Sequence, residues 1–375
     1  MELRAEKIER VVVRGANWVG DAVMTVPALR ELRRLLPRAR ITLATRAWAR
    51  DIFEGADFVD DLLVVESARG VRPFFRQARD WRARRFDLAL LLPNSMEPAL
   101  VAFAARVPSR VGYATQGRGE FLTHALETPA WRAVRHEVFY YLNLVAGLER
   151  ALAGSSEIEA REPRFALEVS DARKARARAL LESRGVVAAR PLVALCPGST
   201  NSRAKRWHAD RYAALADRLI EEAGATALLI GAREELDVTQ EVLSKMRRRP
   251  VVLTGETSLA ETTALLSVAD LLVTNDTGPA HLASALGRPT LVIFGPTNPL
   301  TTRPFAPAAE VVRRPPDCAP CMLRDCPIDH RCMTAITTDE VFARAVALLG
   351  LRAARPGAEA DAGDQLVGLE AGAAR

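Results

Sequence analysis

The feature that most constrains this chain is an alternation of short apolar runs with amphipathic segments of helical period. In the first half, runs such as "RVVVR" and "LALLL" are followed by helical patterns, as in Thr25–Leu36. Strands that alternate with helices indicate βαβ units, and continuous apolar runs suit parallel strands covered on both faces. The expected strands here are Arg10–Arg14, Arg40–Thr45, Leu62–Glu66, Phe86–Leu92 and Arg110–Tyr113.

The alternation is repeated in the second half, after a charged segment over 157–190. There Ser170 is a plausible N-cap and Gly185 a stop for a connecting helix. The expected strands are Leu192–Cys196, Thr226–Gly231, Val251–Leu253, Leu271–Thr274 and Thr290–Phe294. The sequence therefore predicts an α/β protein of two doubly wound domains, 1–168 and 169–352. The Ala-, Gly- and acid-rich tail 353–375 is expected to be disordered.

Composition narrows the functional classes. No apolar run reaches the roughly 18 residues of a membrane span, and the first ten residues lack a signal-peptide core, so a cytoplasmic protein is expected. The net charge is +6, from 52 Lys and Arg against 46 Asp and Glu. This excess indicates either a solvated basic surface or attraction to anionic lipid headgroups or a nucleotide. No segment combines basic and aromatic residues as nucleic-acid sites do, so no nucleic-acid partner is expected.

The first motif is "CPGSTNSRAKRWHADRYAAL", Cys196–Leu215. A strand ends at Cys196, and Ser199 and Thr200 then offer hydroxyls near exposed backbone N–H groups. Lys205, flanked by two arginines, precedes a helix. Hydroxyls, backbone amides and a cation after a strand are the components of a diphosphate site. The alternative is a charged surface loop without a ligand.

The second motif is "LLVTNDTGPAHLASALGRPTLVIFGPTNP", Leu271–Pro299. An apolar strand runs into Asp276, Thr277 and Gly278, and a helix follows with His281 one turn in. The N-terminus of a helix attracts anions, and Gly278 allows a ligand close to the backbone. Taken singly, Asp276 could be an N-cap and His281 a packed residue. Together with "GPT" at the end of the next strand, they favour a ligand site.

The third motif is "RGANWVGDAV", Arg14–Val23, whose glycines have phosphate-loop spacing. Asp21 stands where such a loop has its Lys, so phosphate binding is not expected there. A carboxylate at a strand end, facing a cationic second domain, suggests a general base. The alternative is a helix N-cap. If the regular helix begins near Thr25, as Pro27 suggests, Asp21 lies in an irregular loop before it.

These three motifs together resemble the ADP-heptose:lipopolysaccharide heptosyltransferases, glycosyltransferase family nine. The resemblance covers roughly residues 10–350, and "NWVGD" with the late cysteines is most similar to the heptosyltransferase II branch. It implies a GT-B fold of two Rossmann-like domains, with the acceptor bound by the first and the nucleotide-sugar by the second. It implies inverting transfer of L-glycero-D-manno-heptose from ADP-heptose to heptosyl-Kdo-lipid A in the inner core of lipopolysaccharide, without a metal or another cofactor.

The resemblance also assigns residues. Asp21 matches the catalytic base, and Asp276 matches the aspartate that holds the heptose. Glu234 is the candidate for ribose binding. The expected diphosphate contacts are Ser199, Thr200, Lys205, Thr277, Gly278 and His281, with Arg203 or Arg206 able to share that role. A monomer at the cytoplasmic face of the inner membrane is expected. Heptosyltransferase I, or a GT-B transferase with another donor or acceptor, is the alternative.

Two segments remain open. Cys318, Cys321, Cys326 and Cys332 have the spacing C-x2-C-x4-C-x5-C, which indicates either a structural metal site or reduced thiols in a loop. With the basic composition they also motivate a remote alternative, a metal-dependent nucleic-acid-binding module. The stretch "RPFFRQARDWRARRFD", Arg72–Asp87, mixes arginines with aromatic residues. It is either a lipid-facing amphipathic helix or a helix packed by its aromatic side chains.

Overall fold

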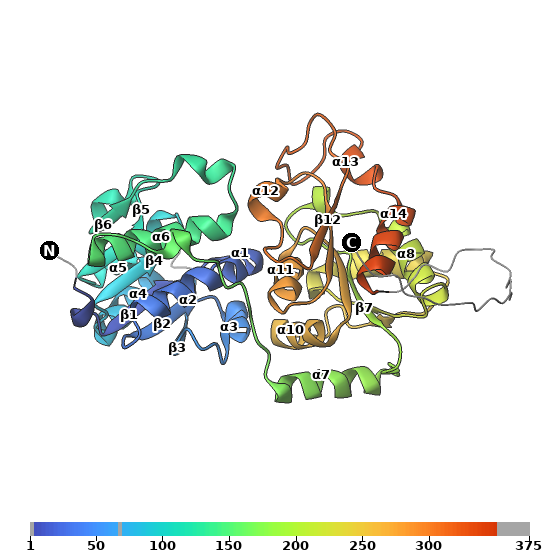
Figure 1. Cartoon of the computed structure of the whole chain (residues 1–375), viewed down its shortest axis with the longest axis horizontal. Coiled ribbons are helices and arrows are strands. Elements are labelled where there is room, and N and C mark those ends of the chain that lie inside the picture. The colour runs from blue at the N-terminus through green and yellow to red at the C-terminus, as the bar shows by residue number, and fades with distance from the viewer. Residues whose placement is uncertain (1–3, 67–69, 351–375) are drawn as a thin grey trace, which may run out of the picture.

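Two parallel six-stranded sheets make up the molecule (Figure 1). The computed structural model describes residues 4–66 and 70–350, so the predicted tail 353–375 lies outside the described residues. The first sheet has the order β3-β2-β1-β4-β5-β6. The second has the order β12-β11-β10-β7-β8-β9, which is the same arrangement when β7 is counted as its first strand. Both are Rossmann-like sheets, so the predicted α/β fold class is confirmed.

In the first half strands and helices largely alternate around the first sheet, except that two helices follow β1 and no α-helix separates β5 from β6. Its strands are β1 (Arg10–Arg14), β2 (Arg40–Thr45), β3 (Asp61–Val64), β4 (Leu88–Leu91), β5 (Ser109–Tyr113) and β6 (His124–Leu126). Its helices are α1 (Val19–Met24), α2 (Val26–Leu35), α3 (Ala47–Phe53), α4 (Val71–Arg84), α5 (Met96–Ala104) and α6 (Glu137–Ala153). Helices α4 and α5 cover one face of the sheet. The side chains of α2 and α6 pack on the other face.

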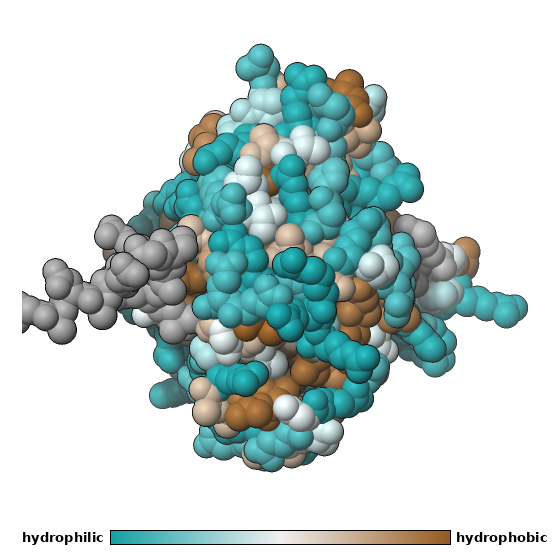
Figure 2. Space-filling view, turned by 90° about the vertical axis from the view of Figure 1, so that its right-hand side faces the viewer, coloured by the Kyte–Doolittle hydropathy of each residue, from teal (hydrophilic) through white to brown (hydrophobic). Residues whose placement is uncertain are grey.

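The second half repeats this plan. Its strands are β7 (Leu192–Cys196), β8 (Thr226–Leu229), β9 (Val251–Val252), β10 (Leu271–Asn275), β11 (Thr290–Phe294) and β12 (Ala309–Arg313). Its helices are α7 (Asp171–Ser183), α8 (Ala209–Glu221), α9 (Leu236–Lys245), α10 (Leu259–Val268), α11 (Gly278–Ala285), α12 (Pro299–Thr302), α13 (Arg331–Thr334) and α14 (Thr338–Leu348). The outer end of this half is mainly hydrophilic, with small apolar patches (Figure 2).

The connection between the halves passes between them before it reaches α7 (Figure 1). Leu167 in this segment donates its backbone N–H to the Ala285 carbonyl of α11, 2.8 Å away. Ser170 caps α7, as predicted, by accepting from the Arg173 N–H. The predicted domain boundary at 168/169 falls in this connection. One cluster of buried apolar side chains runs through both halves.

Candidate active site

Asp21 lies at the end of the first half that faces the second sheet. The prediction that it belongs to an irregular loop is wrong, because Val19–Met24 form the short helix α1 and Asp21 is its third residue. Pro27 does separate this helix from α2, where it stands in the first turn and needs no N–H partner. Asp21 is not the N-cap, which is Trp18.

The Asp21 carboxylate is electrostatically unusual. Its pKa is raised from 3.8 to about 6, mainly by burial and also by the nearby Glu137 carboxylate. The cations of Lys205 and Arg132 act in the opposite direction. Among the described residues, the Asp21 side chain has no hydrogen-bond partner, whereas Glu137 pairs with Arg132 at 3.3 Å. A half-buried carboxylate that is free of hydrogen bonds and faces a lysine of the other half is suited to accept a proton.

Asn275 ties together the two strand-end motifs of the second half. This side chain ends β10 and is completely buried. Its amide group donates to the carbonyls of Pro197 and Gly198, at 2.8 and 3.2 Å. Its oxygen accepts from the Trp207 N–H and the Tyr212 hydroxyl, at 3.0 and 3.2 Å. All hydrogen-bonding positions of the amide are therefore used, which fixes the loop after β7 against the end of β10.

Lys205 contacts Asp276 of the second motif, which lies 71 residues further along the chain. Its ammonium lies 2.8 Å from Asp276 Oδ2 and 3.1 Å from the Asp276 carbonyl. Asp276 is almost fully buried, and its Oδ2 also accepts from the Thr297 hydroxyl at 2.6 Å. The structure thus brings together Lys205, Asp276 and the "GPT" turn after β11. No pattern in the sequence predicted the direct ion pair between Lys205 and Asp276.

Glu235, rather than Glu234, enters the loop cluster. Glu234 is exposed, whereas Glu235 is 7% exposed and lies against Gly198, where any Cβ would collide with its carboxylate. Glu235 accepts from the Thr200 hydroxyl at 3.3 Å and from the Ala232 N–H at 2.9 Å. Burial raises its pKa. The short turn Arg233–Glu235 decides which of these two adjacent side chains points inward, and the predicted ribose contact of Glu234 stays a prediction.

The remaining candidates of the first strand-end motif divide into buried and exposed groups. Ser199 is buried, and its carbonyl accepts from the Arg206 guanidinium at 3.2 and 3.3 Å. Arg203 is exposed and pairs with Asp325 at 2.6 Å. Of the two arginines proposed to assist Lys205, Arg206 is therefore the one held beside the loop.

Helix α11 contacts α1 directly, and glycines make this contact possible. Thr277 is the N-cap of α11, and a Cβ on Gly278 would lie 2.7 Å from the Val19 Cβ. A Cβ on Gly20 would lie 2.9 Å from His281 Cδ2. His281 is 4% exposed, and burial lowers its pKa to about 4, so the ring is neutral at pH 7. In this structure His281 is thus packed between the halves, and its predicted phosphate contact stays a prediction.

The cysteine segment braces the Lys205 loop. The Arg324 carbonyl accepts from the Ala204 N–H at 2.9 Å and from the Ser202 hydroxyl at 3.1 Å. Burial raises the pKa of Cys332 to about 11, and the other three clustered thiols, Cys318, Cys321 and Cys326, act in the same direction. Across residues 4–66 and 70–350, no three His, Cys, Asp or Glu side chains are arranged to hold a metal ion. Both interpretations of the cysteines, a structural metal site and reduced thiols, therefore stay predictions.

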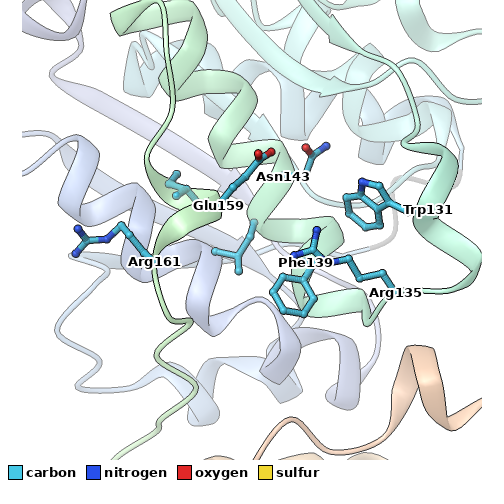
Figure 3. A pocket seen from close by; sticks show the side chains of 8 residues that line it. Trp131, Arg135, Phe139, Asn143, Glu159 and Arg161 are labelled. Atoms are coloured by element: carbon cyan, nitrogen blue, oxygen red, sulfur yellow. The ribbon is translucent and has the colours of Figure 1, made fainter.

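One surface hollow lies apart from these residues (Figure 3). It is bordered by α6 and by the connection that follows, and Arg135 lies over the Phe139 ring at 3.9 Å. Its lining residues are Trp131, Arg135, Phe139, Leu142, Asn143, Ile158, Glu159 and Arg161. It includes none of the predicted site residues, so the candidate active site is defined by the junction of α1 and α11 with the loops beside it.

Two Rossmann-like halves whose strand-end loops meet in this way define a GT-B glycosyltransferase. The sequence profile described as glycosyltransferase family 9 (heptosyltransferase) matches residues 74–331. A curated relative, lipopolysaccharide heptosyltransferase 2 of Salmonella typhimurium, is 30% identical over 315 residues, covering 81% of this chain and 88% of the relative. The chain belongs to glycosyltransferase family 9, which confirms the resemblance found in its motifs.

Solved structures agree with this assignment. The structure of Escherichia coli ADP-heptose lipopolysaccharide heptosyltransferase II has a TM-score of 0.76 and 27% identity, covering 91% of this chain and 98% of that chain. The family 9 glycosyltransferase from Veillonella parvula has a TM-score of 0.81 and 25% identity, with 93% and 98% covered. Both similarities span the two sheets, so the GT-B fold extends over both halves.

Proposed function

We propose that this enzyme transfers L-glycero-D-manno-heptose from ADP-heptose to the heptosyl-Kdo-lipid A inner core of lipopolysaccharide. Its relatives are named heptosyltransferase 2, which supports this donor and this acceptor. The observation that carries the proposal is the unpaired Asp21 carboxylate, with a pKa raised to about 6, opposite the Lys205 loop. That arrangement supplies a base on one side of the sugar and cations on the other.

In the proposed reaction, Asp21 takes the proton of the acceptor hydroxyl as its oxygen attacks the anomeric carbon of the heptose. The new C–O bond forms as the bond from that carbon to the diphosphate oxygen breaks, and ADP leaves with the electron pair. Attack opposite the leaving group inverts the anomeric configuration. Lys205, Ser199, Thr200 and the α11 N-terminus at Thr277 and Gly278 would stabilise the diphosphate.

Two carboxylates would position the donor. Asp276 is proposed to hold the heptose, and Glu235 takes the ribose role first considered for Glu234, because Glu235 is the one turned into the loop. The transfer is proposed to need no metal ion, since cations and a helix N-terminus can neutralise the leaving diphosphate. A monomer without a nucleic-acid partner remains a prediction.

A donor screen tests the proposal. ADP-, GDP- and UDP-sugars are incubated with deacylated core acceptors carrying either no heptose or one heptose, and products are measured by mass spectrometry. We expect product only from ADP-heptose with the heptosylated acceptor. Transfer to the heptose-free acceptor would instead indicate heptosyltransferase I, and use of another nucleotide-sugar would contradict the proposed donor.

Membrane contact is a further part of the proposed function. Within the described residues, no helix has the length and apolarity needed to cross a bilayer. In α4, Trp81 is buried in the core, whereas Val71 and Phe75 are exposed by 71% and 62% beside exposed arginines. Because α4 follows β3, these two residues lie at the carboxyl edge of the sheet. We propose that this end of α4 contacts anionic lipid headgroups at the cytoplasmic face of the inner membrane.

Vesicle sedimentation checks this contact. Phe75→Ser combined with Arg79→Gln should reduce binding to vesicles containing phosphatidylglycerol, with little change on pure phosphatidylcholine. Val187→Ser with Arg178→Gln alters equally exposed residues outside α4 and serves as the control. Equal losses in both double variants would contradict the α4 assignment.

A further inference from the structure

Trp18 is exposed in a way that the fold does not explain. All five tryptophans lie in the described residues, and Trp18, at 57%, is the only one in the exposed class. Within residues 4–66 and 70–350 its ring takes part in none of the aromatic pairs or cation–π contacts. Tryptophan normally contributes a large buried apolar area, so leaving this ring in water forgoes a stabilising contribution.

Trp18 also occupies a position where helix stability favours a different residue. It is the N-cap of α1, and its side chain makes no capping hydrogen bond. Ser, Thr, Asp or Asn at an N-cap would satisfy a free N–H group of the first turn, which an indole cannot do. Residues that break a local rule without a structural gain are expected at functional sites.

The position of Trp18 relates it to the base. Trp18 is the N-cap of α1, and Asp21, three residues further on, lies in the first turn of the same helix. Between them, Val19 and Gly20 contact α11 of the second half. Trp18 therefore stands one turn before Asp21 in the chain, directly before the residues of α1 that contact the second half.

We propose that Trp18 is the platform on which a sugar ring of the acceptor stacks during transfer. The face of an indole is large, apolar and electron-rich, and it suits the C–H face of a pyranose while leaving the hydroxyls at the ring edge free. A sugar seated there would present an edge hydroxyl to Asp21. This inference rests on the proposed function for its acceptor, and it makes Trp18 an acceptor-binding residue with no part in holding ADP.

The test compares Trp18→Phe and Trp18→Ser with Trp48→Phe, which makes the same aromatic exchange at the half-buried Trp48 of α3. Three quantities are measured: the KM for a deacylated heptosylated acceptor, the Kd for ADP, and the thermal midpoint. For Trp18→Ser we expect the acceptor KM to rise about tenfold or more, a loss consistent with removing one aromatic contact. Trp18→Phe should retain most of the acceptor affinity, and Trp48→Phe should match the unaltered enzyme.

The thermal midpoint separates binding from a structural role. Serine is a favourable N-cap, so Trp18→Ser should keep or raise the midpoint and leave the ADP Kd unchanged. A lowered midpoint together with a weaker Kd for ADP would overturn the proposal, since it would show that the indole supports the fold. An unchanged acceptor KM in Trp18→Ser would overturn it as well.

A fluorescence measurement gives a readout independent of turnover. Acceptor added with ADP should protect the enzyme from acrylamide quenching, and Trp18→Phe should remove that protection while Trp48→Phe keeps it. Protection that persists in Trp18→Phe would contradict the assignment. If the unaltered enzyme transfers no heptose to any core acceptor, the proposed function fails; if it transfers heptose but the Trp18 variants behave like Trp48→Phe, only this inference fails.

Discussion

The strand-end loops of the two halves occupy equivalent places in the same fold but differ in how far their polar side chains are hydrogen-bonded. After β7 and β10, polar side chains are cross-linked: Asn275 uses every hydrogen-bonding position, and Asp276 is paired with Lys205. After β1, Asp21 has no hydrogen-bond partner among residues 4–66 and 70–350, and its pKa is raised. A rigid hydrogen-bond network fixes the groups that bind a ligand, whereas a proton acceptor must keep its lone pairs free.

We expect the largest effect on activity when the Asp21 carboxylate is removed. Asp21→Asn should lower kcat by about 10²–10⁴-fold, the usual contribution of a general base, while the ADP Kd stays nearly unchanged. The thermal midpoint should hold or rise at neutral pH, because the amide avoids the cost of a charged buried carboxylate. Turnover equal to that of the unaltered enzyme would remove Asp21 from its role.

Asn275→Ala should destabilise the hydrogen-bonded loops after β7 and β10. Removing a buried amide with four hydrogen bonds should lower the free energy of unfolding by about 2–4 kcal/mol, since several buried partners lose their bonds. Denaturant unfolding measures the change. The control is Asn298→Ala, which removes a single capping bond to the Leu300 N–H and should cost about 1 kcal/mol. Equal losses would show that the Asn275 network adds no special rigidity.

Lys205→Met keeps most of the side-chain length and removes the charge. We expect ADP to bind roughly 10–100-fold more weakly, because a charge-assisted contact contributes about 1.5–3 kcal/mol. Arg203→Met removes an exposed charge of the same loop and should have little effect. Isothermal titration calorimetry measures both affinities, and an unchanged ADP affinity in Lys205→Met would reject the diphosphate role.

The smallest expected effect is a shift of the pH profile when the charged residues near Asp21 are changed. With a pKa of about 6, Asp21 loses its base form as the pH falls through 6, so kcat/KM should decline about tenfold per pH unit below that value. Glu137→Gln removes a like charge, which should lower the Asp21 pKa and move this decline to lower pH. Arg132→Gln removes an attractive charge and should move it to higher pH. Identical pH profiles for both variants would show that Asp21 is not the titrating group.

Much of this fold could be predicted because its central strands are uninterrupted apolar runs. The bounds of β1, β2, β7 and β11 agree with those predicted from the sequence. The edge strands β6 and β12 were missed, since "HAL" and "AEVVR" are too short or too polar to differ from loops. The other two edge strands, β3 and β9, were predicted because their apolar residues stand out from the surrounding sequence.

The site was predictable only at the level of motifs. Asp21, Lys205 and Asp276 were singled out from their places after strands. The ion pair of the last two joins segments 71 residues apart, which come together only because β7 lies beside β10 in the sheet. The buried Glu235 was not singled out from the sequence, and helix α1 was not predicted because it is only 6 residues long. Contacts set by the rotation of a short turn leave no periodic signal in the chain.

The glycine contact between α1 and α11 has a consequence for the timing of turnover. Val19 and Gly20 lie against Gly278 and His281 with no room for even a methyl group, so a bulky diphosphate cannot reach that end of α11 past them. We therefore expect each catalytic cycle to include a separation of the two halves to admit the donor and another to release ADP. The steady-state rate of such an enzyme can be set by these openings, and a raised solvent viscosity would slow them while leaving the bond-forming step untouched.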